Sequence, residues 1–410
     1  MKARYLLAAV LMGWLSLWLS AADAAPLPAP YRPPFTPTSD AEVLQQVPAD
    51  SDAAVRAMKA LRAALDSNPN SLAAADQLAR AYIDFGREIG DAHYAGYAEA
   101  VLKPWLDQLP PPAAAVVDEA VILQFRHQFD DARRLLKQVV AADPRNAQAW
   151  LTLATIDMVQ GDYPSAAREC ARVGGRGEFQ LGIACIANLR SYLGQAQQST
   201  LLLSKLVSDS SSQTASYKAW VHGMLAESAE RLGDWPQAEG HYRQALAQTP
   251  KDNYLLVSYA DFLLDRNRPQ EVLELLRDSS QSDTAFLRLA LAKAALQSPE
   301  LAQYTWIMGA RFEALSQRGS DYFGREQVRF ALYLQHDAQI ALNLAQRNWQ
   351  VQRAPWDIRV LLEAALAANQ PEAASTAITF VRDTKLQDPV IDQLIKQLQS
   401  EPRTVAVRLQ

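Results

Sequence analysis

Few residues of this 410-residue chain combine the types and the spacing that catalysis or metal binding needs. The five histidines include no pair four residues apart and none has a neighbouring cysteine. Because a metal ion needs several converging ligands, we expect no metal site and interpret these residues as surface or turn histidines. They are His93, His127, His222, His241 and His336.

Other catalytic signatures are also missing from the sequence. The stretch GGRGEFQLG, at 174–182, is rich in glycine but lacks the spacings that hold phosphates. No G-x-S-x-G nucleophile elbow occurs. The helical repeats described below leave no uninterrupted stretch of about 100 residues for a catalytic domain. We therefore predict a protein that is not an enzyme, with no catalytic residue and no cofactor.

The chain has two cysteines, Cys170 and Cys185. They fall in successive expected helices that should pack together, so a disulfide can form if the chain is exported to an oxidising compartment. Such a bridge closes a loop of about 15 residues and would stabilise the fold by about 3 kcal/mol. The alternative is two buried thiols that pack as small apolar residues.

The phrase GDYPSA, at 161–166, is nearly repeated as GDWPQA at 233–238. Each suits a joint between antiparallel helices, because glycine adopts the turn, aspartate caps the next helix and proline fits its first turn. Ala238 is small where the preceding helix crosses, and Tyr242 fills the space one turn later. We interpret the phrase as scaffolding rather than as a ligand-binding loop.

Ala166 and Ala238 of these phrases also mark a period. Matching residues recur at intervals near 34 residues, each followed by an apolar residue four places later and most by another seven places later. The markers are Ala57, Ala98, Ala132, Ala166, Ser199, Ala238, Val272, Ala302, Ala341 and Ala374. Proline falls twelve residues after four of them, at Pro69, Pro110, Pro144 and Pro250.

With this period, the chain from about residue 52 to about residue 385 resembles a tetratricopeptide-repeat (TPR) protein. It carries the family's apolar–small pair and turn glycine, as in Leu153-Ala154 followed by Gly161. The resemblance implies an all-α solenoid of about nine to ten helix pairs in a right-handed superhelix. The stretch 90–105, GDAHYAGYAEAVLKPW, also resembles a segment of secreted, uncharacterised repeat proteins of Gram-negative bacteria.

The resemblance further implies that the first helices of the repeats line an extended concave groove rather than a deep cleft. Aromatic side chains beside charges suit a peptide or protein ligand there. In the middle repeats the expected groove carries several carboxylates, and Arg231 alone opposes their charge locally. We therefore expect a partner segment with Lys or Arg beside an apolar residue. The alternative is that these residues are solvated helix faces. The candidates are Trp220, Glu227, Glu230, Arg231, Tyr254, Asp261, Asp265, Trp356 and Arg359.

The first 24 residues have the pattern of an export signal. Lys2 and Arg4 precede an apolar stretch that ends before the A-x-A sequence at 22–24. The stretch is shorter than the roughly 20 residues that span a membrane, which disfavours an anchor. We expect a signal peptide at 1–24, a Pro-rich extended segment at 25–51, the solenoid with a C-terminal capping helix at 52–398, and a tail at 399–410.

The net charge of −5 is spread along the chain without the basic stripe that nucleic acid requires. We predict a periplasmic or secreted adaptor, from a Gram-negative bacterium, that binds a protein or peptide in its groove. It would bind no nucleic acid and would not stay in a membrane once the signal is cleaved. The alternative function is a structural subunit of an envelope or secretion complex.

Overall fold

The computed structural model describes residues 52–175, 178–208, 213–317 and 324–400. The expected signal peptide and Pro-rich segment, and all but the first two residues of the expected tail, lie outside these ranges. Within them the chain forms twenty α-helices, one short 3-10 helix and no strand. The helices are α1 Ala53–Ser67, α2 Leu72–Ile89, α3 His93–Leu106, α4 Ala113–Phe125, α5 Phe129–Ala142, α6 Ala147–Gln160, α7 Tyr163–Gly174, α8 Phe179–Tyr192, α9 Ala196–Ser208, α10 Ala215–Leu232, α11 Trp235–Gln248, α12 Asn253–Asp265, α13 Pro269–Leu275, α14 Asp283–Ala295, α15 Leu301–Gln317, α16 Gly324–Tyr333, α17 Ala338–Val351, α18 Pro355–Ala367, η1 Pro371–Ala374, α19 Ser375–Thr384 and α20 Pro389–Gln399.

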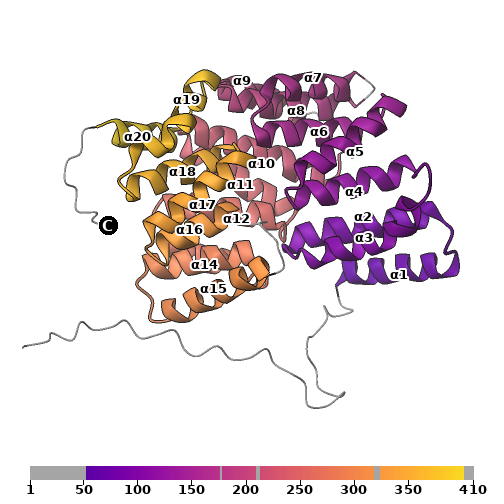
Figure 1. The fold of residues 1–410 in the computed structure, drawn as a ribbon, viewed down its shortest axis with the longest axis horizontal. Coiled ribbons are helices and arrows are strands. Elements are labelled where there is room, and N and C mark those ends of the chain that lie inside the picture. The colour runs from indigo at the N-terminus through magenta and orange to yellow at the C-terminus, as the bar shows by residue number, and fades with distance from the viewer. Residues whose placement is uncertain (1–51, 176–177, 209–212, 318–323, 401–410) are drawn as a thin grey trace, which may run out of the picture. The chain divides into compact units, whose positions relative to one another are not determined.

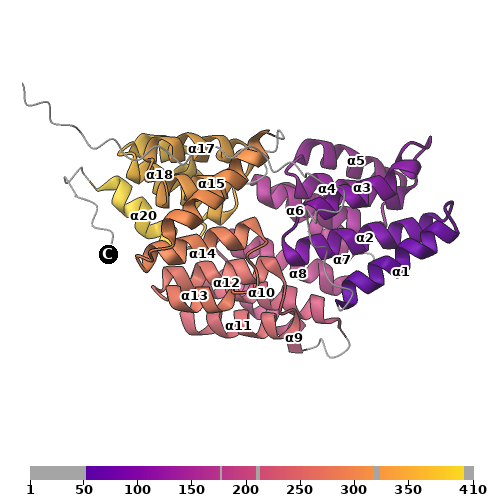
Figure 2. The same ribbon diagram turned by 90° about the horizontal axis from the view of Figure 1, so that it is seen from below.

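The helices pack in pairs, and each pair packs on the next (Figure 1). The closest partners are the two helices of one repeat, such as α6 with α7 and α10 with α11. Seen from below, α10, α12 and α14 lie in one row, and α11 and α13 lie in a second row beside it (Figure 2). Eight of the ten marker residues are buried where the paired helices cross, as Ala166 and Ala238 show. The predicted all-α repeat solenoid is therefore confirmed.

Both repeated phrases form the predicted helix–turn–helix joint. Gly161 and Gly233 take the left-handed conformation, with φ of 79° and 72°. The Asp162 side chain accepts from the backbone N–H of Ser165 at 3.1 Å, and Asp234 caps α11 in the same way. Glycine ends one helix and aspartate begins the next, as helix-terminus chemistry requires.

At two of the ten marker positions the predicted register is wrong, because the marker residue is not buried. Ala57 in α1 and Ala302 in α15 are exposed, and α15 buries Met308 and Phe312 instead. The interval between the markers Val272 and Ala302 is short because α13, the second helix of that repeat, has only seven residues.

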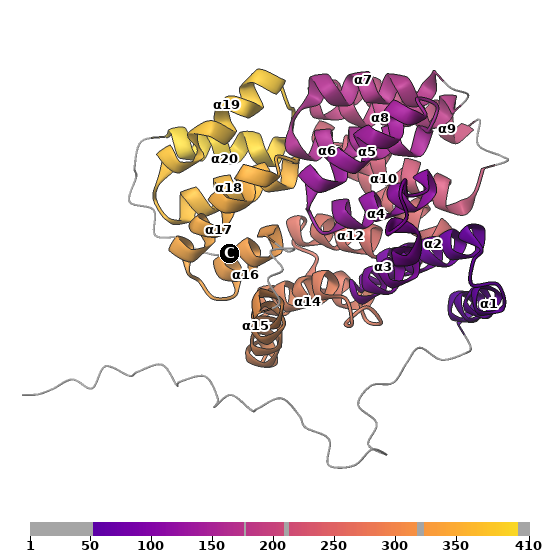
Figure 3. The same cartoon turned by 45° about the vertical axis from the view of Figure 1, so that its right-hand side comes forward.

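The C-terminal helices pack onto the middle repeats, as both Figure 1 and Figure 3 show. The backbone N–H of Arg353 donates to the carbonyl of Val159 at 2.7 Å, and α20 contacts both α18 and α10. The turns after α6, α8 and α10 face this C-terminal segment, with Gly161 beside Phe380, Gly194 beside Lys385 and Gly233 beside Pro389. The groove of the solenoid is thereby closed over on one side.

Cys170 in α7 and Cys185 in α8 are joined by a disulfide, with their Cα atoms 5.4 Å apart. Both residues are fully buried between their helices. None of the helices in the described ranges is long and apolar enough to cross a membrane.

Candidate functional site

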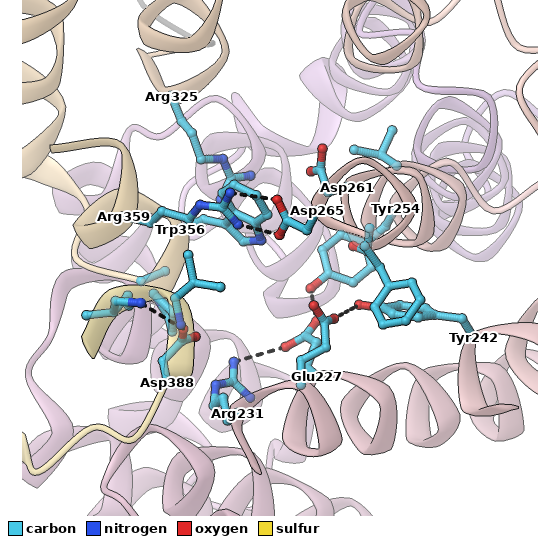
Figure 4. A pocket seen from close by; sticks show the side chains of 18 of the residues that line it. Glu227, Arg231, Tyr242, Tyr254, Asp261, Asp265, Arg325, Trp356, Arg359 and Asp388 are labelled. Carbon is cyan, nitrogen blue, oxygen red and sulfur yellow. Dashed lines mark hydrogen bonds and ion pairs between the residues drawn. The ribbon is translucent and has the colours of Figure 1, made fainter. Parts of the chain in front are cut away.

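The concave face of the middle and C-terminal repeats encloses a cavity of about 130 Å³. Its walls come from α8, α10, α11, α12, α14, α16, α18 and α20, together with the short turns beside them (Figure 4). The sequence predicted an extended concave groove and no deep cleft. That prediction is wrong here, because the C-terminal helices fold back over the first helices of the middle repeats.

Eight of the nine predicted groove residues line this one cavity. The exception is Trp220, which lies earlier on α10 with 37% of its surface exposed and its ring 6.1 Å from that of Tyr217. The eight that converge are Glu227, Glu230, Arg231, Tyr254, Asp261, Asp265, Trp356 and Arg359.

Capped N-termini of α12 and α18 fix the positions of the side chains that these helices contribute. The Asp252 side chain accepts from the backbone N–H of Leu255 at 3.1 Å and fixes the start of α12. At α18, Pro355 occupies the first turn and Asp357 accepts from the N–H of Ala354 at 3.0 Å. A capped start sets the rotation of each helix, and hence which side chains face the cavity.

Asp261 is the centre of a buried ion network. Its two carboxylate oxygens accept from Arg288 at 3.0 and 2.7 Å, and Arg329 donates to one of them at 2.7 Å. Arg288 also donates to Glu326 at 3.2 Å. Burial alone would raise the pKa of the Asp261 carboxyl, but the charges of Arg288 and Arg329 hold that pKa well below its usual value. Asp261 is therefore charged and fully paired.

Asp265 is held equally firmly. Arg359 donates to both of its carboxylate oxygens, at 2.6 and 2.7 Å, across 94 residues of sequence. The same guanidinium donates to Glu363 at 2.7 Å and lies 4.3 Å from the ring centre of Trp356. This bidentate pair joins α12 to α18 and so fixes the two walls of the cavity against each other.

Glu227 and Glu230 also have partners. Glu227 accepts from the Tyr254 hydroxyl and, at 3.3 Å, from Arg231, and Glu230 accepts from the Tyr242 hydroxyl. Burial raises the pKa of Glu230 to about 8, although the bond from Tyr242 opposes that shift. Glu230 is therefore largely uncharged at neutral pH.

These pairs overturn one expectation. The sequence suggested a row of carboxylates opposed locally by Arg231 alone. Instead Arg288, Arg329 and Arg359 neutralise Asp261 and Asp265. The error arose because two of the three arginines belong to helices whose groove positions the repeat pattern did not assign.

Sequence reasoning also missed Trp235, Arg266, Arg288 and Arg325, which line the cavity. Arg288 had a usable signal, because it is a single charge inside the apolar run AFLRLALA of α14. Trp235 belongs to the GDWPQA joint and carries the Arg266 guanidinium 3.9 Å from its ring centre. Arg325 carried no such signal.

No group of three or more metal-ligating side chains of the His, Cys, Asp or Glu type occurs among the described residues. His222 in α10 and His241 in α11 lie within helices and are half-buried, so the prediction of surface or turn histidines is wrong for this pair. Their Nδ1 atoms are 3.3 Å apart. Burial lowers the pKa of His222 to about 4. His127 and His336 occupy turns with positive φ, as expected.

Comparison with known families agrees with this architecture. Residues 126–177 and residues 224–283 each match a family described as Tetratricopeptide repeat. The fold is a tetratricopeptide-repeat solenoid. The second match runs from within α10 through α13, and so includes most of the predicted groove residues. No curated protein matches the chain in sequence.

Several solved structures are similar to the chain. One is the APC/C hetero-tetramer Cut9-Hcn1, at 14% identity and a TM-score of 0.42, covering 85% of this chain and 53% of that one. The chain thus spans about half the length of that relative. The human IFIT1 dimer with m7Gppp-AAAA has 13% identity, a TM-score of 0.44 and coverages of 81% and 86%. A tetratricopeptide repeat protein from Parabacteroides merdae has 10% identity, a TM-score of 0.32 and coverages of 83% and 100%. At these TM-scores the likenesses carry no inference about ligands.

Proposed function

We propose that this chain is a non-enzymatic adaptor that binds a segment of a protein partner in the central cavity. One observation carries the proposal: side chains from the first helices of successive repeats converge with aromatic residues on a single enclosed space. Tetratricopeptide repeats generally serve as protein-binding scaffolds, and aromatic anchors beside charged groups are what a protein ligand needs.

The proposed compartment is the periplasm of a Gram-negative bacterium. Two features support it. The first is the pattern of a basic start, an apolar stretch and an A-x-A site in residues 1–24. The second is the Cys170–Cys185 disulfide, a bond that persists in oxidising compartments. Cell fractionation and N-terminal sequencing test this, and a cytoplasmic protein that still begins at Met1 would refute it.

The function is tested by crosslinked capture from the source cells with a cavity-filling variant. Ser258 lines the cavity on α12, and Ser258→Trp would occupy the space. Gln138→Trp adds the same side chain to an exposed position of α5, away from the cavity. The proposal expects Ser258→Trp to lose the captured partner and Gln138→Trp to keep it. Equal capture by both variants, with unchanged circular dichroism, would show that the cavity is not the binding site.

A further inference from the structure

Two histidines lie opposite each other on the paired helices α10 and α11. Ala226 of α10 and Ala238 of α11 are fully buried in the same apolar cluster, so the two helices come close together at these small side chains. His222 lies four residues before Ala226 on α10. His241 lies three residues after Ala238 on α11, so each histidine shares a helix face with one of the alanines. Because the two helices run antiparallel, both imidazoles fall at the same level of the pair.

The two imidazoles turn the same atom toward each other. Their Nδ1 atoms are 3.3 Å apart, whereas the ring centres are 5.4 Å apart and the ring planes differ by 32°. Since the centres are much farther apart than the nitrogens, the rings are arranged edge to edge. Gln244, three residues after His241 on α11, places its side-chain Oε1 3.3 Å from His241 Nδ1. Two nitrogens and an amide oxygen therefore lie close together at the edge of one helix pair.

The separation of the two nitrogens suits a shared metal ion better than a hydrogen bond. An N–H group usually donates over about 2.9–3.0 Å. A Zn²⁺ ion lies about 2.0–2.1 Å from each histidine nitrogen that binds it, and a tetrahedral angle then places two such nitrogens about 3.4 Å apart. The 3.3 Å between the Nδ1 atoms of His222 and His241 is close to this second value.

Both imidazoles are in the protonation state that binds a metal ion. Burial and the neighbouring His241 lower the pKa of His222 to about 4. Burial also lowers the pKa of His241, although Gln244 and Asp234 oppose that shift. Both rings are therefore neutral at neutral pH, and a metal ion binds the neutral ring. The two histidines are only half-buried and Gln244 is exposed, so an ion with its water ligands can reach the nitrogens.

We propose that His222 and His241 bind a divalent metal ion of the Zn²⁺, Ni²⁺ or Cu²⁺ class through their Nδ1 atoms, with the Gln244 amide oxygen and water as further ligands. Imidazole favours these ions, whereas Mg²⁺ and Ca²⁺ prefer oxygen ligands. A search for histidines four residues apart does not detect this pair, because 19 residues separate the two. Neither histidine lines the central cavity, so the inference is independent of the proposed function.

The test is a titration of the mature chain, purified without a histidine tag, with ZnCl₂. Titration calorimetry measures the affinity and the number of ions bound, and thermal unfolding measures the Tm. We expect one Zn²⁺ per chain and a rise in Tm of about 2 °C or more at saturating Zn²⁺, because the ion binds the folded pair. MgCl₂ at the same concentration should change neither signal.

Variants identify the ligands. His222→Gln and His241→Gln should each weaken Zn²⁺ binding about tenfold or more, because a single imidazole loses the advantage of two joined ligands. His93→Gln is the matched control, since His93 is an exposed histidine on α3 whose Nδ1 lies 2.7 Å from Asp91. The control should keep the full affinity for Zn²⁺ and the full rise in Tm.

X-ray absorption at the zinc edge tests the site without any substitution, and so remains informative if a variant fails to fold. The parent chain should show two imidazole nitrogens at about 2.0–2.1 Å from the metal. A spectrum with one imidazole or none would overturn the proposal. So would the absence of Zn²⁺ binding, an equal response to Mg²⁺, or full affinity in either folded histidine variant. None of these results would affect the adaptor function, which Ser258→Trp tests separately.

Discussion

The turns at Gly161 and at Gly233 have nearly the same sequence and the same backbone, but different surroundings. In the first, Tyr163 is buried, with its ring 5.7 Å from that of Phe380 in the C-terminal segment. In the second, Trp235 is only partly buried, stacks under Arg266 and lines the cavity. One joint therefore serves packing alone, and the other also builds the candidate site.

The difference shows that the short repeated motif determines the conformation of the joint but not the surroundings of its aromatic residue. Gly, Asp and Pro set the joint through hydrogen bonds within a few residues. What covers the aromatic residue that follows depends on helices more than 100 residues away in sequence. The third such turn, at Gly194, makes the same point, because it lacks the aromatic–proline pair yet packs directly on the backbone of Lys385.

Among the substitutions considered, we expect the largest change in the free energy of unfolding at this third turn. A Cβ at Gly194 would overlap the carbonyl oxygen of Lys385, and the residue has a φ of 68°. Backbone strain and displacement of a packed backbone together predict that Gly194→Ala lowers the free energy of unfolding by about 4 kcal/mol. Urea denaturation followed by circular dichroism measures it. Gly240→Ala, where an added Cβ meets nothing within 4 Å in α11, should instead stabilise by about 0.5 kcal/mol.

A loss at Gly194 no larger than about 1 kcal/mol, the cost of backbone strain alone, would contradict this packing. The C-terminal segment would then not rest on the turn. The comparison of the three turns would lose its basis.

The second prediction concerns the pH dependence of the stability, which should change through Glu230, three residues before Gly233. Burial raises the pKa of Glu230 to about 8, against 4.5 for an ordinary Glu, with Tyr242, Asp265, Glu227 and Arg231 around it. Between these pH values the folded chain binds a proton that the unfolded chain has lost. This group alone should therefore lower the stability by about 1.4 kcal/mol per pH unit as the pH rises from 5 to 8.

Glu230→Gln should abolish this contribution, so that the variant matches the parent near pH 5 and exceeds it at pH 8. Urea unfolding at several pH values measures both slopes. Parallel slopes would show that Glu230 is ionised in the folded chain. The cavity would then be more acidic than the structure indicates.

The third prediction is a loss of stability of intermediate size at the Gly161 turn. A Cβ at Gly161 would lie 2.8 Å from the Phe380 ring, which must then move. Gly161→Ala should cost about 2 kcal/mol, part from backbone strain and part from the displaced ring. Adding Phe380→Leu should recover some of that loss in a double-mutant cycle. Strict additivity of the two substitutions would show that the ring does not press on the turn.

The sequence predicted the features that recur within each repeat. It did not predict the contacts between repeats that are far apart in the chain. The period, the joints and the inward-facing residues of α10, α12 and α18 follow from patterns of a few residues, and eight of nine groove candidates do share one cavity. The pairing of Asp265 with Arg359 across 94 residues does not follow from any such pattern. It depends on how sharply the repeats curve, which accumulates from small rotations between neighbours.

The smallest effect is expected at the turn that borders the cavity. A Cβ at Gly233 would lie 3.5 Å from Pro389, an ordinary contact, so Gly233→Ala meets only the strain of its φ of 72°. We expect a loss of about 1 kcal/mol, measured by the same urea denaturation. Gly233→Asn should lose less, because asparagine tolerates this conformation better than alanine. If Gly233→Ala costs as much as Gly161→Ala, the two turns are equally packed, and the contrast between a packing turn and a cavity turn fails. A loss near 1 kcal/mol would instead show that the Gly233 joint borders the cavity without pressing on the C-terminal helix.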